Sequence, residues 1–168
     1  PLYLERLADL DLTTPPEAGK LGAEKVRSAT TTHMFYSLLY TLDLYQFVWG
    51  PAWTLYGPKD LVELVQAGTG WDVSLKELVQ AGERRLNMLR AFNAREGFDR
   101  KEDTLPKKFF KPLQGTGPTA GIAIDPVEFE KALDLYYQYV GWTSQGLPTQ
   151  AKMAELGLEW AAEGLPAL

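Results

Sequence analysis

The segment from Met34 to Phe47 constrains the fold most, because its apolar side chains surround a helix instead of forming one stripe. These side chains are Met34, Phe35, Leu38, Leu39, Leu42, Leu44 and Phe47. A helix that is apolar on nearly all sides is normally buried on most of them. We therefore predict one long helix from about Glu17 to Val48, ended by Gly50-Pro51, with other helices packed around it.

Local signals predict the surrounding helices. Ser74-Leu75-Lys76-Glu77 has the pattern of a capping box, and the helix that it starts should end near Gly97. Asp125-Pro126 indicates another helix start, with Gly141 at the far end, and Thr149 should cap a last short helix. Further short helices are expected at residues 2–10 and after Pro58.

No pair of alternating apolar runs is present, so the sequence predicts no sheet. Residues 98–124 are the least periodic stretch and are interrupted by prolines and glycines. The predicted fold is all-α: a single irregular multi-helix domain over residues 1–168, with a long non-regular arm at about 98–124 packed over it. Gly82 lies inside a predicted helix, where glycine costs about 1 kcal/mol relative to alanine, so we predict that another helix approaches it closely.

The composition excludes several kinds of site. The chain has no cysteine and one histidine, which excludes disulfides, thiolate ligands, a cysteine nucleophile and the usual His/Cys zinc site. We assign no catalytic and no metal-ligating residue. The net charge of −5 argues against nucleic acid and anionic membranes as partners. The longest apolar run is too short to span a bilayer, and we expect a soluble, cytoplasmic protein.

A run of basic residues has two interpretations. It could hold a phosphate through guanidinium contacts, or its members could pair with the acidic residues among them, which is the favoured interpretation. The basic residues are Arg84, Arg85, Arg90, Arg95, Arg100, Lys101, Lys107 and Lys108, and the acidic ones are Glu83, Glu96, Asp99, Glu102 and Asp103.

Three other features carry open alternatives. Asp43 could be a buried group with a raised pKa or an exposed residue on a narrow polar strip, and we favour exposure. For His33 a structural role is favoured over a catalytic one. The aromatic residues Trp49, Trp53, Tyr56 and Trp71 are expected to pack in the core, with the lining of a flat ligand site as the minority alternative.

A series of motifs extends through the second half of the chain. The stretch GERRLNMLRAFNAREG at residues 82–97 is followed by DTLPK at 103–107, and later by YY (136–137), GW (141–142), GLPT (146–149) and LGL (156–158). In order and spacing this series resembles the carboxy-terminal end of the tungsten-containing aldehyde:ferredoxin oxidoreductases. That family typically shows GERxxNLxRxFNxREG, then DxLPxR, then a YYxxRGWDxxGxPTxxxLxxLGL tail. Departures occur at Val140, Thr143 and Lys107 or Lys108, which stand where the pattern has Arg, Asp and Arg.

The resemblance also implies where a cofactor would lie. The family has a motif Asp-x-x-Gly-Leu-Cys that faces the pterin and gives one cysteine to a four-iron cluster. On that register Tyr40 stands at the aspartate, Asp43 at the glycine and Tyr45 at the cysteine, and Leu44 is retained. The resemblance therefore implies Leu44, Asp43 and Tyr45 as cofactor-facing residues.

The same resemblance implies a function for a larger protein. That protein would oxidise aldehydes to carboxylates at a tungstopterin, with electrons passing through a four-iron cluster to ferredoxin. The chain would be its carboxy-terminal domain, a fragment of a longer protein whose amino-terminal and middle domains are its partners. By itself it is expected to hold no cofactor and to be inactive. The alternative is a non-catalytic helical packing or interaction module derived from that family.

Overall fold

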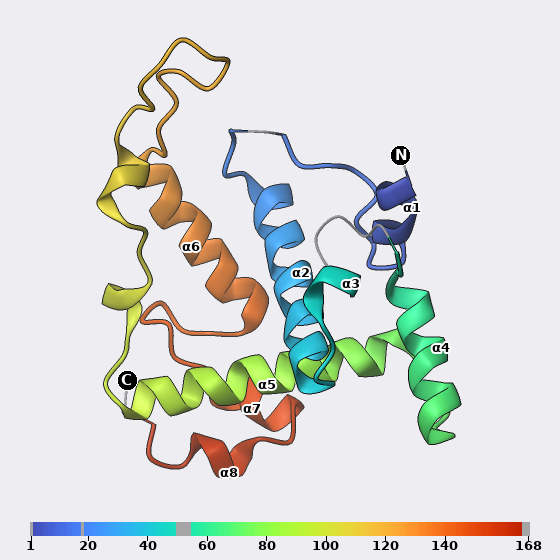
Figure 1. Ribbon diagram of the computed structural model, residues 1–168. Helices are drawn as coiled ribbons and strands as arrows, with labels where there is room; N and C mark the ends of the chain where they lie inside the picture. Colours follow the sequence, from blue (N-terminus) through green and yellow to red (C-terminus); the bar gives the residue numbers. More distant parts are fainter. Residues whose placement is uncertain (1, 18, 50–54, 166–168) are drawn as a thin grey trace.

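The computed structural model describes residues 2–17, 19–49 and 55–165, and within these ranges it is helical (Figure 1). The helices are α1 (Leu2–Ala8), α2 (Ala23–Thr41), α3 (Gln46–Trp49), α4 (Pro58–Thr69), α5 (Leu75–Arg95), α6 (Pro126–Val140), α7 (Gln150–Glu155) and α8 (Glu159–Ala162), with 3₁₀ turns η1 (Arg100–Glu102) and η2 (Lys107–Phe110). The described residues form no strand, only one isolated bridge between Trp142 and Pro148, so the all-α prediction is confirmed. None of the described helices is long and apolar enough to cross a membrane.

The centre of the fold is the crossing of α2 and α5, where α5 runs across the lower half of α2 (Figure 1). Gly82 of α5 is buried at this crossing. A Cβ atom at Gly82 would lie 2.2 Å from the carbonyl oxygen of Met34 and 2.7 Å from the backbone nitrogen of Leu38. The predicted close approach at Gly82 is therefore confirmed, and the second helix is α2.

Two apolar clusters form along α5. The larger one joins α2, α3 and α4 to the segment after α1, through Leu10, Leu12, Phe35, Leu38, Leu39, Trp49, Leu61, Val65 and Leu78. The smaller one joins α5 to α7 and α8, through Ala91, Met153, Leu156, Leu158 and Ala161. Burying such side chains contributes roughly 1.5 to 3 kcal/mol each, and α5 gains from both clusters.

The predicted helix starts are confirmed at the level of single hydrogen bonds. The Ser74 hydroxyl accepts from the Glu77 backbone N–H, and the Glu77 carboxylate accepts from the Ser74 N–H at 2.8 Å. Asp125 accepts from the backbone N–H groups of Val127 and Glu128, the second and third residues of α6, and Thr149 caps α7. Each cap satisfies N–H groups that have no partner within their own helix.

The prediction of one helix from Glu17 to Val48 was wrong at both ends. The helix α2 begins at Ala23 and ends at Thr41, and a turn separates it from α3. Asp43 in this turn has a φ of 53°, and the Leu44 N–H donates to the Leu39 carbonyl at 2.9 Å. This is the Schellman arrangement that terminates helices, with Asp43 at the left-handed position. Gly50-Pro51, the predicted helix end, lies outside the described residues.

The break also changes which side chains are buried. Phe35, Leu38 and Leu39 are at most 1% exposed, as expected for the centre of the core. Leu42 and Leu44, which follow the helix, are only half-buried. Phe47 is 68% exposed, which contradicts its predicted place on a buried helix, because it lies in α3, after the turn that ends α2.

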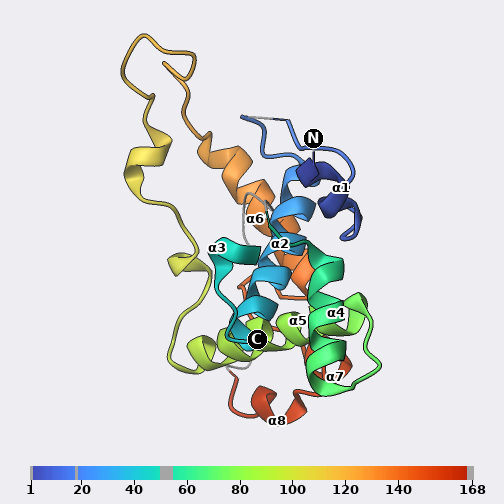
Figure 2. The ribbon, with the colours of Figure 1, turned by 45° about the vertical axis from the view of Figure 1, so that its right-hand side comes forward.

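The irregular arm is confirmed over residues 98–124, apart from the 3₁₀ turns η1 and η2. Its prediction as a segment packed over the domain was wrong for residues 111–123, because every one of them is exposed. They form a loop that projects beyond the end of α6, as both ribbon views show (Figures 1 and 2). Backbone bonds from Leu113 and Gly121 across the loop hold its two sides together.

Candidate functional site

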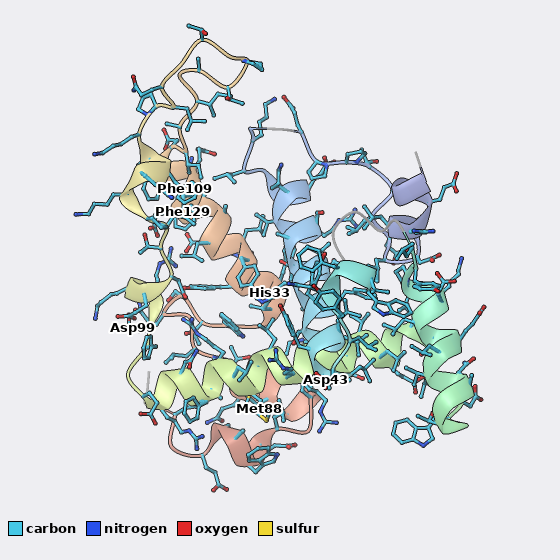
Figure 3. All side chains as sticks on the ribbon, in the orientation of Figure 1. His33, Asp43, Met88, Asp99, Phe109 and Phe129 are labelled. Atoms are coloured by element: carbon cyan, nitrogen blue, oxygen red, sulfur yellow. The ribbon has the colours of Figure 1, made fainter. Side chains whose placement is uncertain are left out.

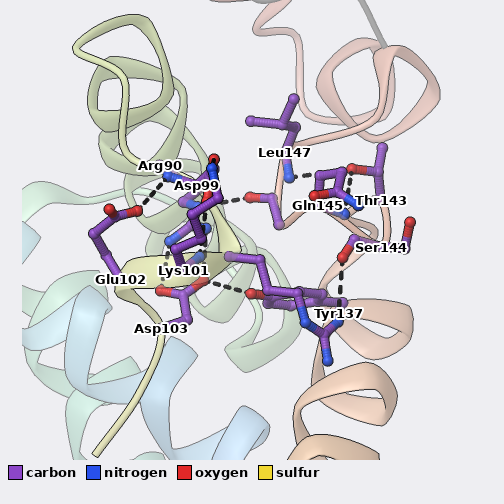
Figure 4. A network of polar contacts seen from close by, with 12 residues as sticks. Arg90, Asp99, Lys101, Glu102, Asp103, Tyr137, Thr143, Ser144, Gln145 and Leu147 are labelled. Carbon is purple, nitrogen blue, oxygen red and sulfur yellow. Dashed lines mark hydrogen bonds and ion pairs between the residues drawn. The ribbon is translucent and has the colours of Figure 1, made fainter.

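Arg90 of α5 is the centre of a buried polar network (Figure 4). Its two terminal nitrogens donate to the two carboxylate oxygens of Asp103 at 2.8 and 2.6 Å, and its Nε donates to the carbonyl of Gly146 at 2.6 Å. The guanidinium also lies 4.7 Å from the ring centroid of Trp142. A bidentate pair of this kind is strong and geometrically specific, so Arg90 fixes the arm and the segment after α6 relative to α5.

Tyr137 of α6 and Gly146 complete this network. The Tyr137 hydroxyl donates to Asp103, and burial together with that carboxylate raises the pKa of Tyr137 well above its usual range. Gly146 has a φ of +75°, and a Cβ atom there would lie 2.3 Å from Arg90 Nη2. Only glycine fits at this position, because the backbone is left-handed and the guanidinium occupies the space of a side chain.

The neighbouring motif residues make similar contacts between distant segments. The indole nitrogen of Trp142 donates to Asn87 of α5 at 2.8 Å, and Lys152 of α7 pairs with Glu83 of α5 at 3.0 Å. Residues of GERRLNMLRAFNAREG therefore contact DTLPK, GW and GLPT directly, and the YY motif joins them through the bond from Tyr137 to Asp103. The motifs that are separated in the sequence meet in one place, where they hold the elements together.

The interpretation of the basic run as paired charges is confirmed in part. Arg90 pairs with Asp103 and Lys101 with Asp99, both among the expected acids. Arg100 instead pairs with Glu130 at 2.7 Å and Asp134 at 2.5 Å, both on α6. The guanidinium groups of Arg90 and Arg100 thus already bind carboxylates. This pairing disfavours a phosphate-binding site between them.

His33 of α2 lies opposite α6, in the region where both helices face α5 (Figure 3). Its Nδ1 is 2.8 Å from the Tyr136 hydroxyl, and the two rings are stacked. Burial raises the pKa of Tyr136 to about 12, so the hydroxyl stays protonated and can donate to a neutral imidazole. Burial and the charge of Arg85 lower the pKa of His33, although the ring keeps contact with solvent. This pairing agrees with the structural role favoured for His33.

Two open pockets meet at His33. One has a volume of about 470 Å³ and lies between α5, α6 and the arm. The other has a volume of about 520 Å³ and lies between α2 and α3, lined by Ala29, Thr32, His33, Tyr36, Tyr40, Gln46 and Phe47. We call the second one the α2–α3 pocket. Both volumes are in the range of small-molecule sites.

The residues that the family register assigns to a cofactor lie at the turn between α2 and α3. Asp43 is exposed in this turn, which agrees with the exposed alternative (Figure 3). Leu44 is half-buried against the core, and Tyr45 is 68% exposed, with its ring 5.4 Å from that of Phe47. Their contact with a cofactor stays a prediction. The glycine of the family motif corresponds to the left-handed residue that ends α2, and this signal could have located the helix end.

These residues do not fit the role of cluster ligands. A four-iron cluster is held by thiolates, and the chain contains no cysteine. In the described part of the chain, no group of three or more His, Asp or Glu residues lies close enough together to hold a metal ion. Thiolate ligands of a four-iron cluster therefore cannot come from this chain.

Aromatic side chains are exposed around this turn instead of packed in the core. Tyr40, Tyr45 and Phe47 are 54%, 68% and 68% exposed, and we call them the α3 face. Of the aromatic residues expected in the core, Trp49 is buried, but Tyr56 and Trp71 are 48% and 65% exposed. That expectation was therefore wrong for Tyr56 and Trp71, and Trp53 lies outside the described residues. Exposed aromatic residues that cluster in this way are typical of interaction surfaces.

Comparison with known proteins identifies relatives of this sequence. The family model "Aldehyde ferredoxin oxidoreductase, domains 2 & 3" matches residues 5–158. The tungsten-containing aldehyde ferredoxin oxidoreductase of Pyrococcus horikoshii is 39% identical over 104 residues, which are 61% of this chain and 17% of that protein. The protein of the same name from Pyrococcus furiosus is 36% identical over 103 residues, 61% of this chain and 16% of that protein.

More distant relatives carry different names. The WOR-like subunit of an aliphatic sulfonate oxidoreductase from Pyrococcus furiosus is 27% identical over 108 residues, 61% of this chain and 17% of that protein. Among solved structures, the active-site complex BamBC of benzoyl coenzyme A reductase matches with a TM-score of 0.52 and 26% identity. That match covers 64% of this chain and 15% of the other. The chain thus spans about one sixth of the length of the relatives that it matches.

Proposed function

This chain belongs to the aldehyde ferredoxin oxidoreductase family, and on that premise we propose that it forms the helical carboxy-terminal part of a tungsten-containing oxidoreductase. The family model covers residues 5–158, and the motif residues within that range form the network around Arg90. That network joins α5 and α6 to the loops at Asp103 and Gly146. We therefore propose a structural role for this chain within the enzyme and no catalysis by the chain alone.

The activity of the whole protein is part of the same proposal. We propose the oxidation of aldehydes to carboxylates at a tungstopterin, with electrons passing through a four-iron cluster to ferredoxin in the cytoplasm. The metal and the pterin would supply the redox chemistry. The thiolates of the cluster would come from the amino-terminal and middle domains, because this chain has no cysteine. The relatives' names support tungsten, and the chain spans only 16 to 17% of their length.

The proposal that those domains are the partner of this chain rests on the α3 face. Tyr40, Tyr45 and Phe47 expose large aromatic rings side by side, although the chain has a sufficient core beneath them. Aromatic rings at the centre of an interface contribute much of its binding energy. The α3 face also carries the register positions of the family's cofactor motif. We propose that the remaining domains of the protein cover this face.

A second candidate function is a non-catalytic helical packing or interaction module derived from the family. It is favoured by one observation: Tyr45 stands at the register position of the cluster cysteine, and its ring is exposed and packed against Phe47. In this alternative the α3 face would still bind a protein partner, but the assembly would hold no tungsten. Metal content separates the two candidates.

Replacing Phe47 with aspartate is expected to weaken association with the remaining domains at least about tenfold. The side chain is 68% exposed, so the stability of the chain itself should change little. The measurement is co-purification and titration of the tagged chain with the amino-terminal and middle domains of the same protein.

The matched control is Trp71→Asp, which changes a side chain of similar exposure beyond the end of α4. It should leave the association intact. Equal effects of the two substitutions, or no effect of Phe47→Asp on association, would show that the α3 face is not the interface.

A further inference from the structure

The pocket of about 470 Å³ between α5, α6 and the arm, which we call the α5–α6 pocket, has apolar walls on both helices. Leu86 and Leu89 line it from α5, and Phe129 and Leu133 line it from α6. The two helices diverge as they leave α2, and the arm runs between their far ends (Figure 1). Leu89 is 42% exposed, so part of the α5 wall faces solvent. The pocket therefore offers an open apolar space with the volume of one small molecule.

The arm adds a polar side to this pocket, and that side is rich in hydrogen-bond acceptors. Glu102, Asp103 and Thr104 line the pocket from the arm. The Oε2 atom of Glu102 accepts from the Asp99 N–H at 2.8 Å. Among the described residues, no cation pairs with Glu102, and its Oε1 atom accepts no hydrogen bond. The arm thus presents a carboxylate oxygen that is available to a donor.

The charges around the pocket favour a cation. Its lining carries one positive group, Arg90, and two negative groups, Glu102 and Asp103. The bidentate pair of Arg90 with Asp103 offsets those two charges, which leaves the charge of Glu102. His33 also lines the pocket, but burial lowers the pKa of its imidazole, so the ring adds no positive charge at pH 7. The remaining charge of the lining is therefore negative.

Two aromatic rings of the lining already attract cations from this chain. The guanidinium of Arg90 lies 4.7 Å from the ring centroid of Trp142, and that of Arg100 lies 5.3 Å from the ring centroid of Tyr137. The face of an aromatic ring is negative and attracts cations at such distances. An ammonium group has three donors and no acceptor, which matches a surplus of acceptors. The pocket therefore selects a ligand with an apolar body and a cationic end.

We propose that the α5–α6 pocket binds a small organic ammonium ion, with its apolar body between Leu89 and Phe129 and its ammonium group on Glu102. The ligand is a free small molecule, not a lysine side chain of a protein partner. No side chain of the α3 face lines this pocket, so the proposal is independent of that interface and of the function of the larger protein.

The test is a titration of the isotope-labelled chain with benzylammonium at pH 7 and low salt, followed through backbone amide shifts. Benzyl alcohol is the matched neutral probe, because it has nearly the same shape and no charge. We expect saturable shifts in residues 86–93, 102–104 and 129–137, with a dissociation constant on the order of millimolar, as suits so small a ligand. Benzyl alcohol should bind about fivefold more weakly, because the carboxylate that it fails to pair with is exposed.

Variants assign the contacts. Glu102→Gln should reduce benzylammonium binding to the level of benzyl alcohol, while the glutamine still accepts from the Asp99 N–H and keeps the cap of η1. The matched control is Glu96→Gln, which changes an exposed carboxylate outside the pocket and should leave binding unchanged. Leu89→Ala should weaken both probes, since it shortens an exposed wall. The amide spectrum of each variant reports whether it is folded.

Equal affinity for benzylammonium and benzyl alcohol would overturn the proposal, as would unchanged benzylammonium binding in a folded Glu102→Gln variant. Shifts that map away from the pocket, or no binding of benzylammonium, would overturn it as well. Tighter binding of benzoate than of benzylammonium would show that Arg90 governs the pocket, which contradicts the proposed cation. Binding of a lysine-containing peptide combined with no binding of benzylammonium would assign Glu102 to a protein contact instead.

Discussion

Replacing Gly82 with alanine should reduce the free energy of unfolding by at least about 3 kcal/mol, or prevent folding. Alanine inside a helix is normally favoured over glycine by about 1 kcal/mol. Here the added Cβ would lie 2.2 Å from the carbonyl oxygen of Met34 and 2.7 Å from the backbone nitrogen of Leu38. Both are backbone atoms of a central helix, so the clash is relieved only by separating α2 from α5. The steric cost therefore outweighs the gain in helix propensity.

Gly68 of α4 provides the matched control for this substitution. It also lies inside a helix, but a Cβ atom there would meet nothing within 4 Å. Gly68→Ala should be neutral or stabilise the chain by up to about 1 kcal/mol. Urea unfolding of both variants measures the difference. A Gly82→Ala variant as stable as the Gly68→Ala variant would refute the close crossing of α2 and α5.

Replacing Asp103 with alanine should have the second largest effect, about 3 kcal/mol of lost stability. The substitution leaves the charge of Arg90 without its carboxylate, although the Arg90 side chain is only 10% exposed. It also removes the acceptor of the Tyr137 hydroxyl. Breaking one partner of a buried pair is costly because the remaining charge is poorly solvated. The arm and the segment at Gly146 should loosen together, since Arg90 holds both.

An exposed ion pair on α6 provides the control, because removing one of its partners measures the loss of stability without burial. Lys131 pairs with Glu128 at 2.8 Å, and the two side chains are 66% and 55% exposed. Lys131→Ala should change stability by no more than about 0.5 kcal/mol. Chemical unfolding combined with hydrogen exchange of the arm and of residues 141–149 measures both effects. If Asp103→Ala costs no more than Lys131→Ala, the network around Arg90 does not hold the fold together.

Structural features could be predicted from the sequence when their physical cause lies within a few neighbouring residues. The caps at Ser74 and Asp125 were predicted correctly because each one is formed by hydrogen bonds within four residues. The close approach at Gly82 was also predictable, because an unfavourable residue inside a helix requires a reason in the packing. In these cases the residue type and its immediate neighbours contain the whole explanation.

The break after Thr41 could not be read from apolar periodicity, because Leu42 and Leu44 continue the apolar pattern while the backbone turns. It depends on Asp43 adopting a left-handed conformation, which aspartate tolerates better than most residues. The burial of the aromatic residues was overestimated for a related reason. Whether Phe47, Tyr56 or Trp71 lies in the core is decided by the direction in which short helices and turns point after that break.

The convergence of the motifs also required the structure. The sequence shows that Arg90, Asp103 and Gly146 belong to the motifs that resemble the family. It does not show that the Arg90 guanidinium contacts both Asp103 and Gly146. Arg100 illustrates the same limit, since its partners Glu130 and Asp134 are about thirty residues away, on α6. Residues near in sequence were the natural first choice as partners, and tertiary contacts replaced them.

The central claim is that this chain is a structural part of a tungsten oxidoreductase and supplies no metal ligand of its own. The most direct measurement is elemental analysis for tungsten and iron, made on the anaerobically purified assembly that contains the chain and on the 168-residue chain after anaerobic reconstitution. The account predicts tungsten and about four irons per cluster in the assembly, and neither metal in the chain alone. Stoichiometric iron retained by the chain through gel filtration, or an assembly without tungsten, would contradict it.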